Sequence, residues 1–447
     1  MKEDFFNQIN DSFVEFSKRT NGKFPAKLKT IRNNAFNSFN SLGFPTKKNE
    51  EWKYTDTSFL YKQDFQLQSQ KEIENKEITD ILKFLINGKK DNIVVLINGR
   101  FSKELSRINT EAEKIKIGSL ADAMVYKAST IEKHFAQYAN YENDAFVALN
   151  TMFASDGCYI RTAEGVIVEN PIQIVYINTA IDYAPIIQPR NLIILGDCSQ
   201  IKLYETYHTI GEQAVFQNTV TEVFMKRFAN FEHYKIQFNN ENSYYIDTTQ
   251  VHQKRASNYT NNTISLKGAF HRNTLGAYLD DELCQTNLYG MYFLGDKDFV
   301  DNHSRIDHAK PNCTSSELYK GIIDDEATAV FNGKIYVWKD AQQTTAYQSN
   351  KNILLSNDAT INSKPQLEIF ADDVKCSHGA TCGNLDKEQL YYLLSRGISD
   401  SKAKALLLNA FASEIVEKIS IAELRDYVKR LVAERFAEED IYFCDNL

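Results

Sequence analysis

The first 155 residues combine helical apolar spacing with one strongly apolar strand pattern. Apolar residues recur at helical spacing at the start of the chain, at Phe5, Phe6, Ile9, Phe13 and Phe16. A second helical pattern begins after Pro25 and ends at Gly43. Each pattern gives a helix with one apolar stripe, and two such helices can pack against each other through these stripes. The chain is therefore predicted to begin with a helical hairpin.

The segment that follows this hairpin predicts one buried strand between further helices. Residues 71–85 are a candidate helix, and the continuously apolar run Ile93–Ile97 is typical of a buried strand. Ser119 and Asp122 form a candidate capping box, after which helical spacing resumes. We therefore expect residues 1–155 to form a mainly helical N-terminal domain with some β-structure.

From about Cys158 to Gly383, short β-branched runs separated by turn residues replace the helical periodicity. These runs are Val166–Val168, Ile172–Ile177, Leu192–Leu195, Ile201–Tyr204, Thr219–Met225, Phe231–Phe238, Asn262–Leu266, Leu288–Leu294 and Ala327–Val337. Evenly repeated short strands fit either a β-sandwich or a stacked parallel β-helix. Because the letters contain no clean repeat period, the pattern alone leaves both architectures open for a core domain of residues 156–384.

The last segment, residues 385–447, returns to helical spacing. Asp386 begins a predicted helix that ends at Gly397. Ser399 is a candidate cap for a second helix, and a capping box that begins at Ser420 introduces a third. An apolar stripe runs along the second of these helices, through Leu407, Phe411 and Ile415. We predict a small helical bundle as the C-terminal domain, with this stripe in its core.

Composition narrows the class of protein. The chain of 447 residues has 51 basic and 59 acidic side chains, and the charges are interspersed, which argues against nucleic acid as a partner. It has acids at Glu3 and Asp4 and no apolar run of about 18 residues, so we expect a cytoplasmic protein without a membrane partner. Seven scattered cysteines, an odd number, indicate reduced thiols rather than a disulfide framework.

The densest group of soft metal ligands is the segment Cys376-Ser-His378-Gly-Ala-Thr-Cys382. In an extended segment, residues two apart project to one face, so Cys376 and His378 could present sulfur and nitrogen together to iron or zinc. The alternative is that both side chains only pack or form hydrogen bonds. A closed zinc site would need further ligands, and C-x-x-C pairs are absent, which favours an open or shared site.

A second group comprises His303, Asp307, His308 and Cys313. The two imidazoles lie five residues apart, which places them on opposite faces of a strand, so a hydrogen-bonded turn or core-edge role is favoured over a metal site. The remaining cysteines are interpreted as small buried or half-buried side chains: Cys158, Cys198, Cys284 and Cys444.

The chain has neither of the usual nucleotide-binding fingerprints, G-x-x-x-x-G-K-[ST] and G-x-G-x-x-G, and it has no G-x-S-x-G nucleophile motif. We therefore expect no ATP to be bound by this chain. The acid pairs Asp280–Asp281 and Asp324–Asp325 leave a β-helical carbohydrate-active enzyme as an alternative. Adjacent acids on a strand point to different faces, however, and such pairs are typical of solvated loops.

The stretch Asp307–Gly321, DHAKPNCTSSELYKG, resembles the SufB/SufD family of iron-sulfur cluster assembly proteins. Further segments resemble this family in the same order, at Phe331–Ile335, Asn352–Asn357, Ile369–Thr381 and Leu385–Gly397, together with Phe44–Tyr54 near the start. Around Cys376 to Ala380 the resemblance favours the SufD branch, because the SufB branch has a different, glutamate-bearing pattern there. The resemblance extends over nearly the whole chain and is weakest between about residues 60 and 150.

The resemblance implies a mainly β fold, with a right-handed parallel β-helix core flanked by N-terminal and C-terminal helical domains. It implies a non-catalytic scaffold subunit that pairs with a SufB-like paralogue through the end of the β-helix. Its C-terminal helices, and with them the exposed flank of the Phe411 stripe, would dock a SufC-like ATPase, whose ATP-driven closure opens the subunit interface. A SufB-like subunit, which carries the principal sulfur-accepting cysteine, remains an alternative.

The resemblance also suggests ligands for a transient iron-sulfur cluster shared with the partner. His378 is the candidate ligand, with Cys376 beside it as a second candidate or a neighbour; imidazole nitrogen and thiolate both bind iron. Cys382 stands where the family tends to have an aliphatic residue, so no ligand role is assigned to it. A flavin is a further candidate cofactor of the assembled complex, with no fingerprint in this chain, and the isolated chain is a candidate homodimer.

Overall fold

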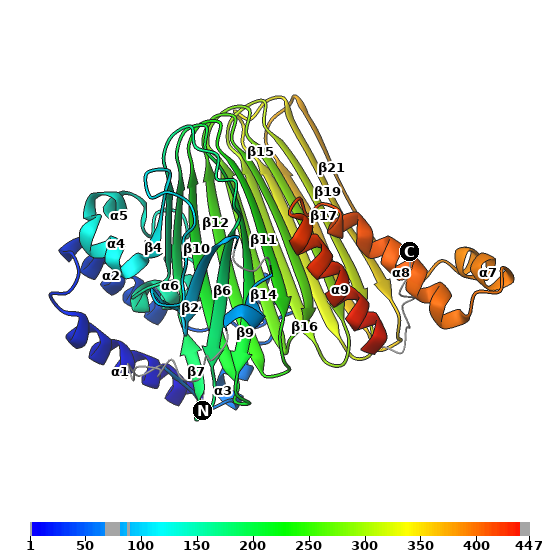
Figure 1. Cartoon of the computed structure of the whole chain (residues 1–447), viewed down its shortest axis with the longest axis horizontal. Coiled ribbons are helices and arrows are strands. Elements are labelled where there is room, and N and C mark those ends of the chain that lie inside the picture. Colours follow the sequence, from blue (N-terminus) through cyan, green and yellow to red (C-terminus); the bar gives the residue numbers. More distant parts are fainter. Residues whose placement is uncertain (1, 68–80, 87–89, 439–447) are drawn as a thin grey trace.

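In the computed structural model, which describes residues 2–67, 81–86 and 90–438, a long stack of strands lies between helices at both ends (Figure 1). The N-terminal part confirms the helical hairpin, as α1 (Lys2–Thr20) and α2 (Ala26–Leu42). It also contains short 3-10 segments, η1 (Glu50–Trp52) and η3 (Ile81–Phe84), and further helices, α3 (Phe59–Lys62), α4 (Leu120–Tyr126), α5 (Ala128–His134) and α6 (Ala145–Phe153).

Local signals predicted most of this N-terminal part. The Ser119 side chain accepts a hydrogen bond of 3.1 Å from the backbone N–H of Asp122, which confirms the cap of α4. The predicted buried strand is β2 (Asn92–Ile97), every residue of which is buried. Most of the candidate helix at residues 71–85 lies outside the described residues, and only its end is seen, as the short segment η3.

The strands form two sheets that the chain visits alternately. Sheet A contains β4 (Ile115–Ser119), β5 (Cys158–Thr162), β8 (Arg190–Leu195), β10 (Val215–Met225), β12 (Ser243–Gln253), β14 (Phe270–Leu279), β16 (Phe299–His308), β18 (Thr328–Val337) and β20 (Thr360–Ile369), with β1 (Phe65–Leu67) and β7 (Ala184–Ile187) at its side. Sheet B contains β3 (Arg100–Phe101), β2, β6 (Ile172–Thr179), β9 (Gln200–Ile210), β11 (Asn230–Phe238), β13 (Asn258–Lys267), β15 (Gln285–Leu294), β17 (Thr314–Ile323), β19 (Thr344–Leu354) and β21 (Val374–Gly383).

This topology is a parallel β-helix. From β6 onward, neighbouring strands in each sheet are parallel and come from successive turns of the chain. His271 pairs with Val300 and Phe299 with Thr328, so one turn takes about 29 residues. The sandwich that the pattern left open is excluded, because its hairpin-connected strands would be antiparallel. The number of residues in one turn of the β-helix varies along the stack, so the amino-acid sequence shows no regular repeat.

The strand predictions failed in two ways. Val166–Val168 is not a strand, because only Ile167 makes an isolated bridge, to Gln200. Several real strands went unrecognised, such as β12 and β16, because polar residues occupy many of their buried positions. Buried polar side chains are expensive unless they are hydrogen-bonded, so the interior of this β-helix depends on polar pairing as well as apolar packing.

Helices cover the outer face of each sheet. An apolar cluster joins α1, α2 and α6 to sheet A through Phe216 and Phe270. A second cluster joins α8 (Asp400–Val416) and α9 (Ala422–Glu438) to sheet B through Tyr234 and Phe293. The C-terminal helices are therefore present as predicted, and α8 and α9 share their apolar core with sheet B.

The remaining C-terminal signals were only partly correct. Asp386 caps α7 (Lys387–Ser395) as predicted, and Gly397 follows the helix at a φ of 82°. Ser399 stands at the start of α8 but makes no capping hydrogen bond. The Ser420 hydroxyl hydrogen-bonds to Glu232 of β11 instead of capping α9. Helix α7 projects from the body of the molecule (Figure 1).

One corner of the β-helix places residues other than glycine in the left-handed region. Phe228 has a φ of 60° and is 54% exposed, at a turn just before β11. The left-handed conformation costs a residue with a Cβ about 1–2 kcal/mol, against about 0.5–1 kcal/mol for the extra chain entropy of glycine. We expect Phe228→Gly to leave the free energy of unfolding unchanged or to raise it by up to about 1 kcal/mol.

Chemical denaturation measures this effect, with Tyr347→Gly as the matched control. Tyr347 is 50% exposed and lies within β19 at an ordinary strand φ. Its replacement should lower the free energy of unfolding by about 1 kcal/mol. Equal losses in the two variants would show that the corner is not strained.

Candidate functional site

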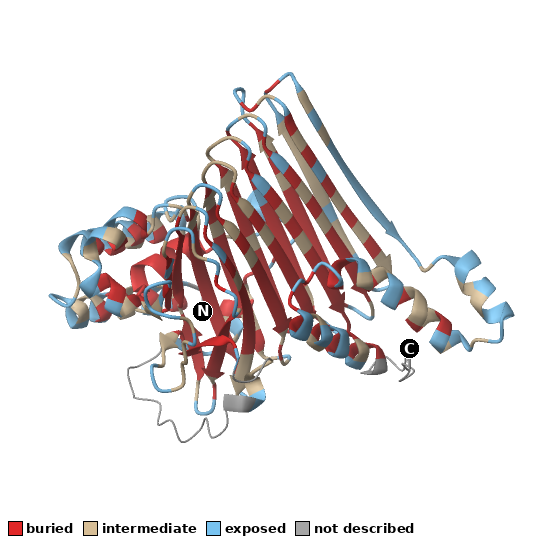
Figure 2. Ribbon diagram, turned by 45° about the horizontal axis from the view of Figure 1, so that its top comes forward, coloured by how far each residue is buried: buried red, intermediate tan, exposed pale blue. Residues whose placement is uncertain are grey.

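The last turn of the β-helix is open. Among the residues that the structure describes, β20 pairs only with β18 and β21 only with β19, so each ends its sheet. Strand β21 has ten residues, of which all except Val374 and Cys376 are exposed (Figure 2). A long edge strand presents a row of unpaired N–H and C=O groups, which is a template for pairing with another chain.

The candidate ligands share one face of this terminal strand. In the parallel register, Cys376 lies beside Ala346 and His378 beside Gln348, two residues that are buried within the β-helix. Residues two apart on a strand share a face, so Cys376 and His378 both belong to the inward face of the last turn. Spacing predicted this shared face, and the open end makes it accessible.

Cys382 lies on this face as well, beside Asn352. Sequence reasoning assigned it no role, although its spacing of four from His378 already indicated the same face. It lies far along the strand, since two strand residues four apart are separated by about 13 Å. Cys382 is exposed, whereas Cys376 is half-buried against the apolar residues Ile335 and Val337.

The described residues of this chain do not close a metal site. Nowhere in residues 2–67, 81–86 and 90–438 do three His, Cys, Asp or Glu side chains come together in a way that could hold a metal ion. Burial raises the pKa of the Cys376 thiol, so a metal must displace its proton on binding. The strand can supply a sulfur and a nitrogen donor, and any remaining ligands must come from another molecule.

The second candidate group does not converge. His303 lies in β16 and pairs through Nε2 with Asp301 at 2.8 Å and through Nδ1 with Glu51 at 3.3 Å. His308 is buried on the opposite face of the strand, where its Nε2 lies 2.9 Å from the Ser315 hydroxyl and burial lowers its pKa to about 4. These contacts agree with the favoured hydrogen-bonding role, within a strand rather than in a turn.

The predicted roles of the other cysteines were partly correct. Cys158 and Cys284 are buried as expected, and so is Cys313. Cys198 is exposed, so its interpretation as a buried side chain is wrong. Cys444 lies outside the described residues.

The segment around Trp52 anchors the N-terminal part to sheet A. Trp52 is buried, with the Arg272 guanidinium 3.8 Å from its ring centre. Arg272 also pairs with Asp301 and donates a hydrogen bond of 2.9 Å to the Glu51 carbonyl oxygen. These contacts give the segment around Trp52 a structural role, in which it holds the N-terminal part against sheet A.

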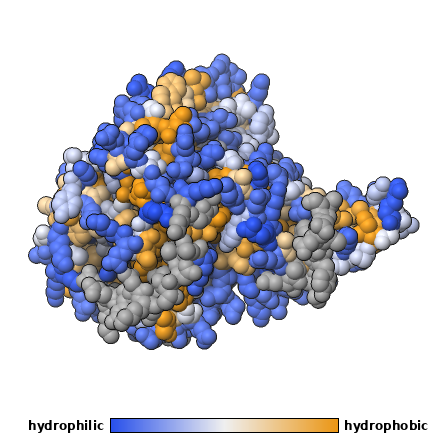
Figure 3. All heavy atoms as spheres, viewed as in Figure 1, coloured by the Kyte–Doolittle hydropathy of each residue, from blue (hydrophilic) through white to orange (hydrophobic). Residues whose placement is uncertain are grey.

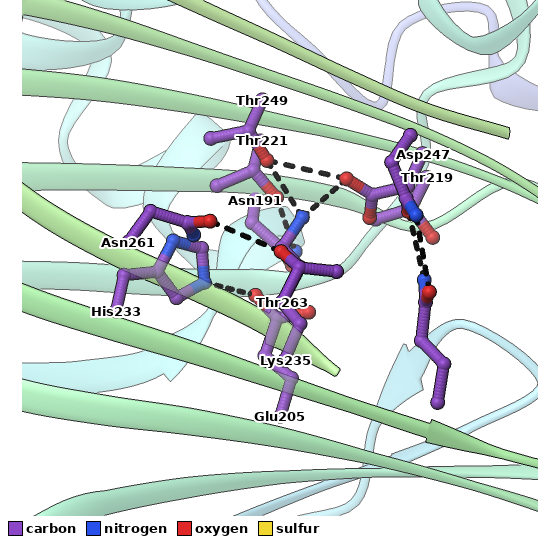
Figure 4. Close-up of polar contacts among 12 residues, drawn as sticks. Asn191, Glu205, Thr219, Thr221, His233, Lys235, Asp247, Thr249, Asn261 and Thr263 are labelled. Carbon is purple, nitrogen blue, oxygen red and sulfur yellow. Dashed lines mark hydrogen bonds and ion pairs between the residues drawn. The ribbon is translucent and has the colours of Figure 1, made fainter. Parts of the chain in front are cut away.

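Sequence reasoning missed a network of buried charged groups inside the β-helix (Figure 4). Glu205 accepts from His233 at 2.6 Å and from the Tyr207 hydroxyl at 2.6 Å, and Lys235 pairs with Asp247. All of these side chains are buried. Nearby charge keeps the pKa of Glu205 at about 2 despite its burial, with Lys235 as the largest favourable influence. Only the folded register brings them together.

A second buried polar group lies nearer the open end, around Glu317 of β17. Gln348 donates a hydrogen bond of 2.6 Å to one carboxylate oxygen of Glu317, and burial raises the pKa of this carboxyl group to about 7. The folded state therefore keeps a proton that the unfolded state releases near pH 4.5. Since the folded state binds more protons, stability falls as the pH rises from about 4.5 to 7.

Glu317→Gln removes this loss while keeping the shape and the acceptor for Gln348. We expect the variant to gain stability relative to the wild type as the pH rises from about 5 to 8, by up to roughly 3 kcal/mol. Denaturant unfolding at several pH values measures the difference. A difference that stays constant with pH would contradict the assignment of this proton to Glu317.

Comparisons with known proteins agree with this architecture. A family model described as "SUF system FeS cluster assembly, SufBD core domain" matches residues 176–411, more than half of the chain. The chain belongs to the SufBD family. A second model, described as "SufBD protein N-terminal region", matches residues 4–174 of this SufBD protein.

Two relatives resemble the chain over most of its length. It is 32% identical to an iron-sulfur cluster assembly SufBD family protein of Synechocystis sp. over 411 residues, 90% of each chain. It is 26% identical to the iron-sulfur cluster assembly protein SufD of Escherichia coli over 395 residues, 88% of this chain and 89% of the relative. Family membership thus links this chain to iron-sulfur cluster assembly.

The placement of the acid pairs and the character of the helices bear on the expectations about a carbohydrate-active enzyme and about membranes. The acid pairs Asp280–Asp281 and Asp324–Asp325 lie at turns between strands, where Asp280 pairs with Lys254 and His252. Such placement gives no support to the carbohydrate-active alternative. Among the helices in the described part of this SufBD protein, none combines the length and the apolar character that crossing a bilayer requires.

Proposed function

We propose that this chain is the SufD-type subunit of a SufB–SufC–SufD scaffold, in which it pairs with a SufB-like paralogue through the open end of its β-helix. One observation carries the proposal: β21 ends a sheet and is exposed along almost all of its ten residues. An exposed edge strand of this kind tends to pair with a strand of another chain, so we expect a partner to cover it. The similarity to the SufD of Escherichia coli supports the choice of branch.

In this proposal the nascent iron-sulfur cluster is cargo, held between the two subunits. His378 is exposed on the inward face of β21 and is the proposed ligand, with the half-buried Cys376 as a second donor or a neighbour. Two donors from one strand cannot hold a cluster alone, so the partner supplies the rest. A site shared in this way releases its cargo when the interface opens, as a transfer scaffold requires.

The SufC-like ATPase is proposed to dock on the projecting helix α7. Tyr391 and Tyr392 are 74% and 57% exposed there, and hydrophobic residues are visible on this projection (Figure 3). Phe411, by contrast, is contacted by the Lys320 ammonium, 4.3 Å from its ring centre. The stripe on α8 is thus partly packed against the β-helix, and α7 offers the freer surface.

The family resemblance alone supports several further proposals. The chain is proposed to be non-catalytic, with ATP hydrolysed by the SufC-like partner. A flavin in the assembled complex has no residues assigned to it here. The cytoplasmic location, the lack of nucleic acid partners and homodimer formation by the isolated chain stay predictions.

Anaerobic co-expression with SufB-like and SufC-like partners tests the proposal. We expect all three chains to co-purify on a tag placed on this chain. A double variant, Tyr391→Ala with Tyr392→Ala, should lose the ATPase and keep the paralogue. Ala380→Pro, which removes an N–H that points away from β19 in this edge strand, should weaken pairing with the paralogue and keep the ATPase. If the wild-type chain purifies without either partner, although both partners are expressed and folded, the SufD-type assignment is wrong.

A further inference from the structure

Two buried cysteines occupy equivalent positions in successive turns of the β-helix. Cys284 immediately precedes β15 and Cys313 immediately precedes β17. The two strands are in parallel register, and the Thr314 N–H donates a hydrogen bond of 2.9 Å to the Cys284 carbonyl oxygen. Neighbouring strands lie about 4.8 Å apart, which falls within the Cα separation of about 4.4–6.8 Å that a disulfide spans.

Their side chains point to the same place. The sulfur atoms of Cys284 and Cys313 each lie 3.2 Å from the Asp281 carbonyl oxygen. The influence of the neighbouring thiol lowers the pKa of Cys284 and raises that of Cys313. The thiols are therefore neighbours, and they differ in their readiness to lose a proton.

We propose that Cys284 and Cys313 form an oxidisable dithiol, which peroxides convert to a disulfide between adjacent turns of the β-helix. This site is independent of the cluster ligands proposed at the open end. It also qualifies the expectation from composition that the cysteines are present only as reduced thiols. The cross-link would add a covalent bond between two strands of sheet B at this corner.

The chemistry balances with peroxide as the oxidant. The Cys284 thiol loses its proton, the thiolate attacks one peroxide oxygen and the O–O bond breaks. The leaving hydroxide takes up that proton, so the products are a sulfenic acid and water. The Cys313 sulfur then attacks the Cys284 sulfur, the S–S bond forms, and the hydroxyl group leaves as a second water. Two thiols and one hydrogen peroxide thus give one disulfide and two waters, and a thiol reductant reverses the change.

The thiols are reached through a surface turn rather than through the core. Cys284 is 1% exposed and Cys313 is fully buried, but Leu283 beside them is 50% exposed. Residues 281–283 form the bend and turn at this corner, where Leu283 has a φ of 63°. Opening this turn would expose the pair without breaking either sheet, which favours a small oxidant over a bulky one.

Peptide mapping of the full chain after treatment with hydrogen peroxide tests the proposal. Remaining thiols are alkylated, the protein is digested without reductant, and cross-linked peptides are identified by mass spectrometry. We expect a Cys284–Cys313 peptide in the wild type that disappears on treatment with dithiothreitol. The oxidised wild type should also have a higher melting temperature, because the link restricts the unfolded chain.

Matched variants make the test specific. Cys284→Ser should lose both the cross-link and the rise in melting temperature, and it should fold, since Ser257 already occupies the equivalent buried position one turn earlier. Cys198→Ser, which removes an exposed thiol, should keep both effects. Recovery of Cys284 and Cys313 as alkylated thiols, under conditions that oxidise Cys198, would overturn the proposal.

Discussion

Replacing His378 with alanine is expected to lower the iron and acid-labile sulfide of the assembled complex by at least about tenfold, because even a lost outer-sphere partner of a metal typically costs 10- to 100-fold in affinity. His378 is exposed on the inward face of β21, where its removal leaves no packing defect. Complex formation should therefore be unchanged. Iron and sulfide assays on the anaerobically purified complex measure the effect.

Ser377→Ala is the matched control for this prediction. Ser377 is also exposed, but it is one residue away and so faces the other side of β21. Its replacement should leave the cluster content at the wild-type value. If His378→Ala loads as much iron and sulfide as Ser377→Ala, the ligand assignment is wrong, whereas the subunit assignment is unaffected. Cys376→Ser then distinguishes a second ligand from a neighbour.

Replacing Glu222 with alanine is expected to cost about 3–5 kcal/mol of unfolding free energy, the typical effect of breaking a fully buried ion pair. The Glu222 and Arg190 side chains are both fully buried, with Oε2 of Glu222 and Nη2 of Arg190 2.6 Å apart. Glu222 also accepts hydrogen bonds from backbone N–H groups of residues 136, 138 and 139. Its loss leaves a buried guanidinium without a counter-charge at the junction between the N-terminal part and sheet A.

Denaturant unfolding of single and double variants tests this junction. Glu222→Ala with Arg190→Met should cost less than the sum of the two single changes, because the double variant leaves no unpaired charge. Glu326→Ala is the exposed control, since its pair with Lys297 lies on the surface and should contribute less than about 1 kcal/mol. A loss below about 1 kcal/mol for Glu222→Ala would contradict the structural role of the pair.

The fold was predictable where one face of an element is apolar and the other polar. The apolar stripe of α1, which was recognised as a helix, satisfies this condition, whereas the continuous apolar run of β2 was recognised as a strand buried on both faces. The strands of the β-helix lack such a division into an apolar and a polar face, because charged residues such as Asp247 and Glu205 occupy buried positions. Their partners come from other turns, so periodicity within one strand cannot reveal them. The family resemblance, not the pattern, identified the β-helix.

The candidate site was predictable only in part. A spacing of two placed Cys376 and His378 on one face, which the register with Ala346 and Gln348 agrees with. The sequence alone could not show that this face belongs to the last, open turn of the β-helix, because that depends on how many turns the chain makes. The same holds for Cys284 and Cys313, which are 29 residues apart and meet only through the strand register.

Hydrogen exchange of β21 tests the central claim, that the open end of the β-helix is the docking surface for a SufB-like partner. Backbone amides of residues 374–383 are compared in the isolated chain, at a concentration where it is monomeric, and in the assembled complex. The account predicts strong protection of these amides in the complex and no change in β13, which is flanked by strands on both sides. Equal exchange of β21 in both states, in a complex shown to be intact, would contradict it.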